Sequence, residues 1–348
     1  MLRGLEESIF KSGLLGYIRI LFLAGDVFDR LLSLDDPSIH HIDLFISKLL
    51  RACTDHGVII RVMEGTPSHD RKQSKRFETI ENMLKTGADL AYVTETSIEY
   101  IPSLQAHVLY VPDEAHPTTI QTKEVVQALL EAHGIEQVTL SIMHGYFQYQ
   151  LPYQTKEGTF HDIDFYQSIT KKWISIGHVH TRSRNGKVLA QGSHDRCGHG
   201  EEGPKGYVVA TVGNKADDAY FIDNPHATVF KSVEVYEMLV EDAVKLLHEE
   251  ADKLLPGARL RIVAEPEDPI FDYASVLQMT YPKIIVSKKP KSRGEQTIAE
   301  KILDNVIGRW QPIRIDETNI VDMVVQRLQK RGEGVDTNRL AKRLQECL

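Results

Sequence analysis

Five short polar clusters in the first two-thirds of the sequence contain the residue types that bind metal ions. They are residues 25–29 (GDVFD), 65–70 (GTPSHD), 144–145 (HG), 177–180 (GHVH) and 192–196 (GSHDR). Aspartate oxygens and histidine nitrogens together suit Mn, Fe or Zn better than Ca or Mg alone. Two such ions about 3.5–4 Å apart can share one carboxylate and hold a phosphate for in-line attack by water. The clusters therefore indicate metal-dependent phosphoester chemistry.

The elements that must position these clusters alternate between strand and helix. Apolar runs predict strands at residues 18–23, 58–63, 90–93, 98–101, 107–111, 137–143, 173–176, 187–190 and 206–212. Apolar residues at helical spacing predict helices at residues 2–17, 38–56, 75–84 and 118–133. Such alternation predicts an α/β fold, in which ligands bind beyond the carboxyl ends of the strands. Each cluster follows an apolar strand, so we expect the clusters to meet at one site.

The character of the sequence changes after about Asn224-Pro225. Residues 229–235 and 259–263 predict strands and residues 240–254 a helix, which together indicate a small α+β appendage. Residues 283–293 (KIIVSKKPKSR) form the densest basic stretch, which we interpret as an exposed charged loop in preference to a DNA-binding segment. From Gln296 onward the pattern predicts amphipathic helices. We therefore expect three parts, residues 1–225, 226–295 and 296–348.

The composition limits the classes of protein to which the chain can belong. Its 348 residues contain 41 Lys and Arg against 49 Asp and Glu, a formal net charge of −8. This acidic balance argues against a protein that coats nucleic acid or anionic lipid by bulk electrostatics, although it leaves local basic patches open. Cys53, Cys197 and Cys347 form no CxxC pair and indicate a reduced chain. We see neither a signal peptide nor an apolar run of roughly 20 residues, so we expect a cytoplasmic protein without membrane contact.

The order of the clusters resembles the calcineurin-like metallophosphoesterases, whose motifs run D-x-H, G-D-x-x-D, G-N-H-D, H and G-H-x-H. Within that superfamily the chain is similar to the SbcD type of DNA nuclease subunit. This similarity rests on Phe28 of GDVFD and on residues 192–209 (GSHDRCGHGEEGPKGYVV). GTPSHD in the place of GNHD indicates a divergent, phage-like branch. The resemblance implies a β-sandwich flanked by helices in residues 1–225, a capping domain in residues 226–295, and a partner-binding helical segment in residues 296–348.

The resemblance also implies a two-metal site. Asp26 would bridge both ions, His144 and His178 would ligate the second ion, and His180 would ligate the first. The implied cofactor is Mn²⁺, with Mg, Fe and Zn as the alternatives. From the residues alone, other interpretations stay open: Asp26 as a turn-capping carboxylate, His144 as a buried histidine bonded to backbone, and His178 and His180 as exposed polar residues at a strand end.

The same resemblance assigns the residues around the metal ions. His69 would protonate the leaving oxygen, Asp70 would orient His69, and Asp29 would hold a loop or a metal ligand in place from behind. The family's asparagine ligand has no clear counterpart. Ser68 occupies its place directly before His69, and Thr66 is the other candidate.

The D-x-H motif that opens the family pattern has no counterpart after Met1. Without it the first ion keeps only Asp26 and His180 as ligands. We therefore expect either a product that lacks its first strand or a chain that binds one ion and is impaired.

Basic residues follow His69 directly. Arg71, Lys72 and Arg76 would lie at the rim of the site, and DNA contact and a solvated helix start are equally open interpretations. Cys197 lies near His194 and His199, but one thiol with irregular histidine spacing does not predict a zinc site.

The leading hypothesis from the resemblance is a Mn-dependent DNA exonuclease and endonuclease. It would act as a homodimer with an SbcC-like SMC-type ATPase in recombination and repair. The alternatives are a metallophosphatase acting on small phosphoesters, and a non-catalytic scaffold subunit in which metal chemistry is lost.

Overall fold

The computed structural model describes residues 2–33, 35–113, 118–150, 160–201, 203–213 and 218–291. Contacts between Cα atoms group the chain up to Lys291 into one compact unit. The expected C-terminal segment, residues 296–348, lies outside the described residues. Its partner-binding role therefore stays a prediction. Within the described ranges, no helix combines the length and the apolar character that crossing a bilayer requires.

A three-stranded parallel sheet carries the first two clusters. Its strands, in spatial order, are β1 (Ile20–Ala24), β2 (Ile59–Met63) and β3 (Leu90–Val93). The helices α1 (Leu2–Glu6), α2 (Ser38–His56) and α3 (Arg76–Leu84) pack on this sheet through a core that includes Phe45, Leu49 and Phe77. Gly57, at φ 66°, ends α2 in the left-handed conformation that glycine adopts without strain. The predicted bounds of α2 are therefore confirmed.

The N-terminal helix is shorter than the predicted residues 2–17. α1 ends at Glu6 and continues as a π-helical turn, Glu7–Lys11, followed by a 3₁₀ turn, Leu14–Gly16. Gly13 separates the two turns at φ 76°, which interrupts a regular helix. The apolar spacing of this segment predicted its helical character but not the change of helix type.

A six-stranded sheet carries the histidine clusters. Its spatial order is β4 (Ser97–Ile101), β5 (Ala106–Val111), β6 (Val138–Gly145), β7 (Thr170–His178), β9 (Val188–Ala190) and β8 (Ser183–Asn185). The four central strands run parallel, and β4 and β8 pair antiparallel at the edges. The helices α4 (Thr119–Ala132) and α5 (Ile163–Ile169) cover one face. The side chains of Thr118 and Asp162 cap the N-termini of α4 and α5, and α5 was not predicted.

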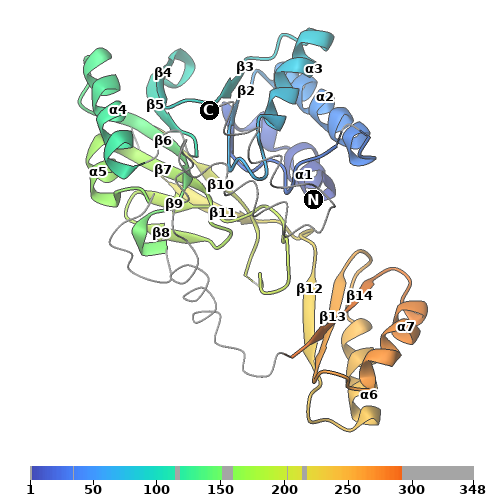
Figure 1. The fold of residues 1–348 in the computed structure, drawn as a ribbon. Helices are drawn as coiled ribbons and strands as arrows, with labels where there is room; N and C mark the ends of the chain where they lie inside the picture. The colour runs from blue at the N-terminus through green and yellow to red at the C-terminus, as the bar shows by residue number, and fades with distance from the viewer. Residues whose placement is uncertain are drawn as a thin grey trace, which may run out of the picture. The chain divides into compact units, whose positions relative to one another are not determined.

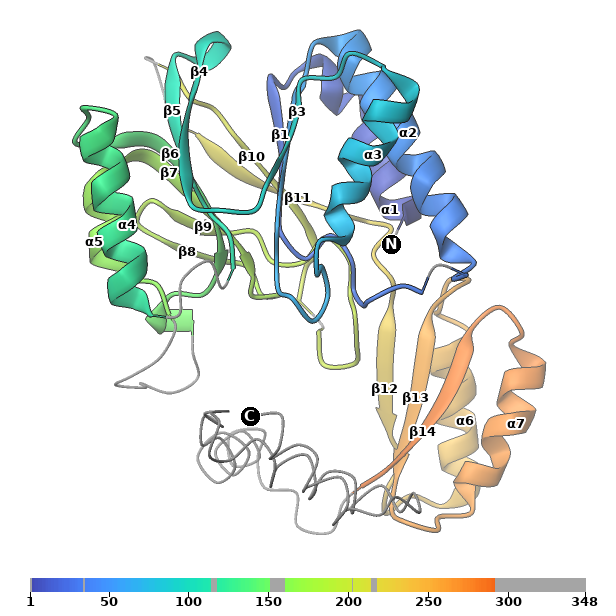
Figure 2. The same ribbon diagram turned by 45° about the horizontal axis from the view of Figure 1, so that its top comes forward.

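The two sheets pack against each other. Buried residues from both sheets, among them Ala24, Met63, Tyr110, Ile142 and Leu189, form one core between them. Figures 1 and 2 show α2 and α3 on the outer side of the small sheet and α4 and α5 on the outer side of the large one. The α/β character expected from the sequence is confirmed, and the parallel strands of both sheets direct their carboxyl ends to the same region.

One charged side chain lies within this packing. Arg61 on β2 is 7% exposed, and its guanidinium donates to Glu99 of β4 at 2.6 and 2.9 Å and to Asp89 at 2.9 Å. Tyr110 of β5 donates its hydroxyl to the same Glu99 carboxylate at 2.9 Å. The fork of Arg61 therefore ties the edge of the large sheet to the middle of the small one.

The remaining strands form two further sheets. β10 (Gly206–Ala210) pairs antiparallel with β11 (Ala219–Asp223). The appendage consists of β12 (Phe230–Glu234), α6 (Val240–Ala251), β13 (Arg259–Ala264), α7 (Ile270–Thr280) and β14 (Ile285–Pro290), with a core of its own. Its three strands are all parallel and are joined through helices, so the predicted α+β character is corrected to α/β. The predicted charged loop at residues 283–293 contains strand β14, because Ile285 to Pro290 pair with β13.

Candidate metal site

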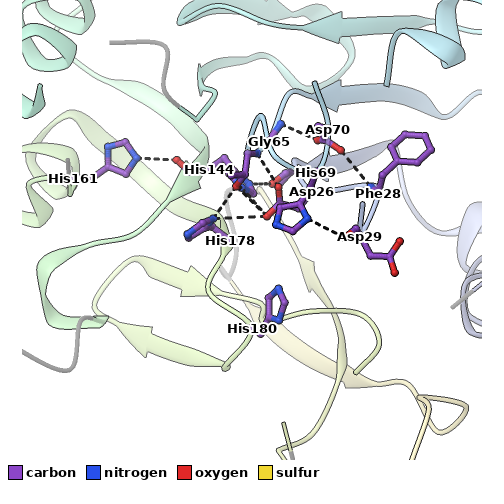
Figure 3. A network of polar contacts seen from close by, with 12 residues as sticks. Asp26, Phe28, Asp29, Gly65, His69, Asp70, His144, His161, His178 and His180 are labelled. Carbon is purple, nitrogen blue, oxygen red and sulfur yellow. Dashed lines mark hydrogen bonds and ion pairs between the residues drawn. The ribbon is translucent and has the colours of Figure 1, made fainter. Parts of the chain in front are cut away.

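Four strand ends meet where the two sheets direct their carboxyl termini. Asp26 follows β1 and Thr66 follows β2, whereas His144 lies near the end of β6 and His178 ends β7. Figure 3 shows Asp26, His144 and His178 pointing toward one another from these elements. The rule that ligands bind beyond the carboxyl ends of the strands (the strand-end rule) therefore predicted correctly that the first four clusters lie close together. Which of their residues contact one another depends on the direction of each side chain.

His144 is fixed by both of its ring nitrogens. It is fully buried, and its Nδ1–H donates to the carbonyl oxygen of Ala24 at 2.7 Å. A carbonyl only accepts, so Nδ1 carries a proton, and Nε2 faces the Asp26 carboxylate with a distance of 3.1 Å to Oδ2. A histidine whose outer nitrogen bonds a carbonyl presents the other nitrogen in a fixed direction, which is the usual arrangement of a metal-ligating imidazole.

Thr66 occupies the middle of the group. Its backbone N–H donates to Asp26 Oδ1 at 2.7 Å, which leaves Oδ2 facing the histidines. Its hydroxyl oxygen lies 3.3 Å from Asp26 Oδ2, 3.3 Å from His144 Nε2 and 3.1 Å from His178 Nδ1. The threonine hydroxyl therefore contacts all three of the other polar side chains.

The donor set fits a divalent cation. The ligand atoms of Asp26, His144 and His178 all lie within 4.8 Å of one another. One carboxylate oxygen and two imidazole nitrogens form a mixed set that suits Mn, Fe or Zn, and the Thr66 hydroxyl adds a weaker oxygen donor. These residues match the site that we predicted for Asp26, His144 and His178, whose roles as ligands stay a prediction.

The electrostatics of the group favour opposite charges on its two central members. Burial raises the pKa of Asp26, but hydrogen bonds from His144, His178 and the Thr66 amide outweigh it and leave this pKa well below its usual range. Burial lowers the pKa of His144, yet the Asp26 carboxylate and the Ala24 carbonyl raise it above the usual value. The carboxylate therefore stabilises a positive charge on the imidazole that faces it.

The backbone around the group is tightly packed. A Cβ atom at Gly25 would lie 2.3 Å from His144 Nδ1, one at Gly65 would lie 2.1 Å from the Asp26 amide nitrogen, and one at Gly177 would lie 2.3 Å from the Ala24 carbonyl oxygen. Side chains at these positions would displace the ligands. Asp26 at φ 48° and His178 at φ 91° also adopt the left-handed region, which costs a non-glycine residue of order 1–3 kcal/mol and is common at functional sites.

The predicted pair of His69 and Asp70 does not form. His69 Nδ1 donates to the backbone carbonyl of Asp29 at 3.0 Å, whereas the buried Asp70 carboxylate accepts the backbone N–H groups of Phe28 and Gly65 at 3.2 and 2.9 Å. The orienting role that we assigned to Asp70 is therefore corrected: Asp70 ties the β1 and β2 loops together. The Asp29 carboxylate is exposed and points away from Asp26, so it is the carbonyl of Asp29 that holds His69 (Figure 3).

The loop after β2 turns Thr66 inward and Ser68 outward. The backbone N–H groups of His69 and Asp70 both donate to the Thr66 carbonyl at 2.9 Å, which closes a turn across Pro67 and Ser68. Ser68 is exposed as a result, and the structure brings Thr66 rather than Ser68 beside the histidines. Of the two hydroxyl candidates that the sequence left open, Thr66 is therefore the one that lies in the group.

The three basic residues predicted at the rim differ in their surroundings. Arg71 and Lys72 are exposed, both at positive φ. Arg76 forms an ion pair with Asp43 of α2 at 2.7 Å, which joins α3 to α2. The structure therefore leaves two of the three available for contact with a substrate.

His180 belongs to a second group. Its Nδ1 lies 3.0 Å from Glu201 Oε1, and its ligand atom lies within 4.8 Å of those of Cys197 and Glu201. Figure 3 shows it apart from the contacts that join Asp26, His144 and His178. The structure therefore does not bring His180 together with Asp26 as the expected first-metal site required.

Sequence reasoning missed two supporting residues. His161 donates from Nε2 to the backbone carbonyl of His144 at 2.9 Å, so it holds the end of β6 in place. Glu201 is the partner of His180, and its only signal in the sequence was a carboxylate in a glycine-rich stretch. Neither residue follows an apolar strand directly, so the strand-end rule could not find it.

Comparisons with known proteins do not connect the chain to a family. No protein-family model and no curated protein sequence matches it. Among the solved structures that match is a crystal structure of MurG from Acinetobacter baumannii, which is 10% identical, covers 81% of this chain and 68% of that chain, and superposes with a TM-score of 0.18. A match at this level supports no inference about fold or function.

These comparisons correct the family assignment. Membership of the calcineurin-like metallophosphoesterases, and of their SbcD type, would be expected to produce a match to a family model or to a curated protein, and neither comparison gives one. GDVFD and GHVH are short, and aspartate and histidine after strands can arise wherever an α/β sheet ends in polar loops. Two sheets packed face to face are observed, but the assignment of this arrangement to the metallophosphoesterase architecture is withdrawn.

Proposed function

We propose that the chain is a metal-dependent phosphodiesterase with its cation held by Asp26, His144 and His178. The observation that carries this proposal is the convergence of the three ligand atoms, within 4.8 Å, from the ends of three parallel strands. A divalent cation bound there supplies Lewis acidity for a phosphoryl oxygen and for the attacking water. The remaining steps fall to side chains of the chain itself.

Each residue of the site has a task in such a reaction. The Ala24 carbonyl and the Thr66 amide orient His144 and Asp26, so that the ligands need little rearrangement when the cation binds. His69 is held by its Nδ1 on the Asp29 carbonyl, which leaves Nε2 for proton transfer to a leaving oxygen. The Asp29 carbonyl requires a proton on Nδ1, so His69 can deliver a proton from Nε2 only as the doubly protonated imidazolium.

DNA is the substrate class that we propose. Arg71 and Lys72 directly follow His69 and Asp70 and are exposed, so they can contact phosphates on either side of the scissile one. The net charge of −8 makes such local contacts necessary, because the protein as a whole repels a polyanion. A small phosphodiester does not need these contacts, which separates the two substrate classes experimentally.

The test compares hydrolysis of duplex DNA, single-stranded DNA and bis(4-nitrophenyl) phosphate with Mn²⁺ and with chelator. Asp26→Asn suits this test because asparagine also tolerates the left-handed backbone at φ 48° while the charge is lost. We expect Asp26→Asn and His178→Gln to lower Mn-dependent hydrolysis by at least about 100-fold, more than the loss of an outer metal partner causes. The matched control is His40→Gln, at an exposed histidine on α2.

Wild-type rates in both variants would overturn the metal site. Hydrolysis of the nitrophenyl ester without any hydrolysis of DNA would retain the metal site and overturn the DNA substrate. Arg71→Ala with Lys72→Ala should reduce the rate on DNA while leaving the rate on the small ester unchanged, since neither side chain contacts Asp26, His144 or His178 among the described interactions.

A further inference from the structure

A second group of metal-binding side chains lies outside the Asp26 site. His180 follows the end of β7, and Cys197 and Glu201 lie four residues apart in the loop between β9 and β10. Their ligand atoms lie within 4.8 Å of one another. Ligands of a tetrahedral zinc ion at about 2.0–2.3 Å are separated by distances in this range, so the three side chains can reach one ion without a large movement.

The loop that carries Cys197 and Glu201 is held in place by its neighbours. Arg196 donates from Nε to the Glu201 carbonyl at 2.9 Å and from its terminal nitrogens to the carbonyls of Thr228 and Gly203 at 3.2 and 3.3 Å. The backbone N–H of Cys197 donates to Glu201 Oε2 at 3.4 Å. Bonds within the loop and to Thr228 therefore hold it in place, and none of them uses the Cys197 thiol or Oε1 of Glu201.

A buried lysine orients the carboxylate. Lys205, 3% exposed, donates from Nζ to Glu201 Oε2 at 2.7 Å, to the His180 carbonyl at 3.0 Å and to Ser193 Oγ at 2.7 Å. It thereby joins the β7 end to the loop and turns Oε1 of Glu201 toward His180. Its positive charge also offsets part of the negative charge of the group, so Lys205 positions the carboxylate at some cost in cation affinity.

The ligand types select the ion. A thiolate prefers softer cations, and thiolate, imidazole and carboxylate are all zinc ligands, whereas the Asp26 group, with one carboxylate and two imidazoles, suits Mn, Fe or Zn. His180 is 43% exposed and Cys197 is exposed, so solvent reaches the group and a fourth position remains for water. We propose that His180, Cys197 and Glu201 form a Zn²⁺ site that is separate from the Asp26 site.

This proposal does not depend on the proposed phosphodiesterase activity, because it shares no ligand with the Asp26 group. The alternative is a hydrogen-bonded pair of His180 and Glu201 beside a Cys197 thiol that binds no metal. The two interpretations differ in whether sulfur bonds to the metal, so the test must report on sulfur directly.

The test uses the reduced full-length chain and Co²⁺ as a spectroscopic substitute for Zn²⁺. Thiolate ligation gives a sulfur-to-cobalt charge-transfer band in the near ultraviolet. We expect this band in the wild type, its loss in Cys197→Ser, and its retention in Cys53→Ala and Cys347→Ala. It should persist in Asp26→Asn, which separates this site from the first. Competition with a chromophoric chelator should show that Cys197→Ser and Glu201→Gln bind Zn²⁺ more weakly, by more than the roughly 10- to 100-fold that loss of an outer partner causes.

Circular dichroism of the metal-free variants controls for folding, and Glu201→Gln replaces Cys197→Ser if the serine variant does not fold. Absence of a thiolate band from the wild type overturns the proposal. A band that survives in Cys197→Ser overturns the assignment of the sulfur. A band that disappears in Asp26→Asn shows that both groups hold one shared ion and overturns the separate site.

Discussion

The Asp26 carboxylate lies 3.1 Å from the Nε2 atom of His144, whose Nδ1 bonds the carbonyl of Ala24 two residues before that same aspartate. The end of β1 therefore supplies both an anchor for the imidazole and the carboxylate that it faces. A buried histidine bonded to backbone was the alternative interpretation of His144. The structure shows that the backbone bond and the contact with Asp26 occur together. The bond from Nδ1 to the Ala24 carbonyl orients the ring so that Nε2 faces Asp26.

Gly65→Ala should damage both the fold and the metal site. An added Cβ would lie 2.1 Å from the Asp26 amide nitrogen and 2.8 Å from Asp70 Oδ2, so Asp26 must move. We expect the free energy of unfolding to fall by about 1–3 kcal/mol, as for other overpacked sites, and Mn²⁺ binding to weaken. Urea denaturation and Mn²⁺ titration measure the two effects. Gly213→Ala is the control, because a Cβ there would meet no atom within 4 Å among the described residues; equal behaviour of the two variants would contradict the packing.

Arg61→Met should weaken the junction between the two sheets. It removes the guanidinium that faces Glu99 and Asp89 and leaves the Glu99 carboxylate bonded only to Tyr110 within its described contacts. We expect a loss of about 2 kcal/mol in the free energy of unfolding. This is less than the ~3–5 kcal/mol of a fully buried pair, because the Glu99 side chain is 34% exposed. Arg61→Lys keeps the positive charge but loses the planar guanidinium. Its free energy of unfolding, measured by chemical denaturation, should lie between those of the wild type and of Arg61→Met. A stability for Arg61→Met equal to that of the wild type would show that the ion pairs contribute nothing.

His194 should make the stability depend on pH. Burial lowers its pKa to about 4 from the ordinary 6.5, so between these values the unfolded chain binds more protons than the folded one. The effect of His194 on the free energy of unfolding is constant above pH 6.5. This free energy falls as the pH falls from 6.5 to 4, and His194 lowers it no further below pH 4. Its full loss is at most about 3 kcal/mol.

Urea unfolding at several pH values tests this prediction. His194→Gln should flatten the profile between pH 6.5 and 4, whereas His226→Gln, at an exposed histidine, should leave it unchanged. The prediction fails if both variants follow the wild-type profile.

The sequence predicted the strand ends better than the identity of the groups that meet there. Asp26, His144 and His178 each follow or end a parallel strand, and the convergence of such ends is a general property of α/β sheets. The choice between Thr66 and Ser68 depended on a turn closed by backbone bonds, which residue types alone do not specify. The partners of His180 depended on the path of an irregular loop, and no periodicity describes such a path.

The helices and strands were likewise predicted well where the sequence pattern is regular and poorly where it is not. Long elements with clear periodicity, such as α2, were predicted to the residue. Several elements were missed, among them α5, α7 and β14. The seven residues of α5 have little periodicity, and the lysines of β14 concealed an edge strand among charged residues. The family resemblance failed for a related reason, since short motifs reflect what strand ends require as well as what ancestry preserves.

Three glycines approach the residues that we propose as metal ligands and leave little free space beside them. A Cβ atom would meet the His144 ring at Gly25, the Asp26 amide at Gly65 and the Ala24 carbonyl at Gly177. Calcium takes six to eight oxygen ligands at about 2.3–2.6 Å, whereas two of the three ligand atoms of this group are imidazole nitrogens. We therefore expect the proposed site to prefer Mn, Fe or Zn to calcium.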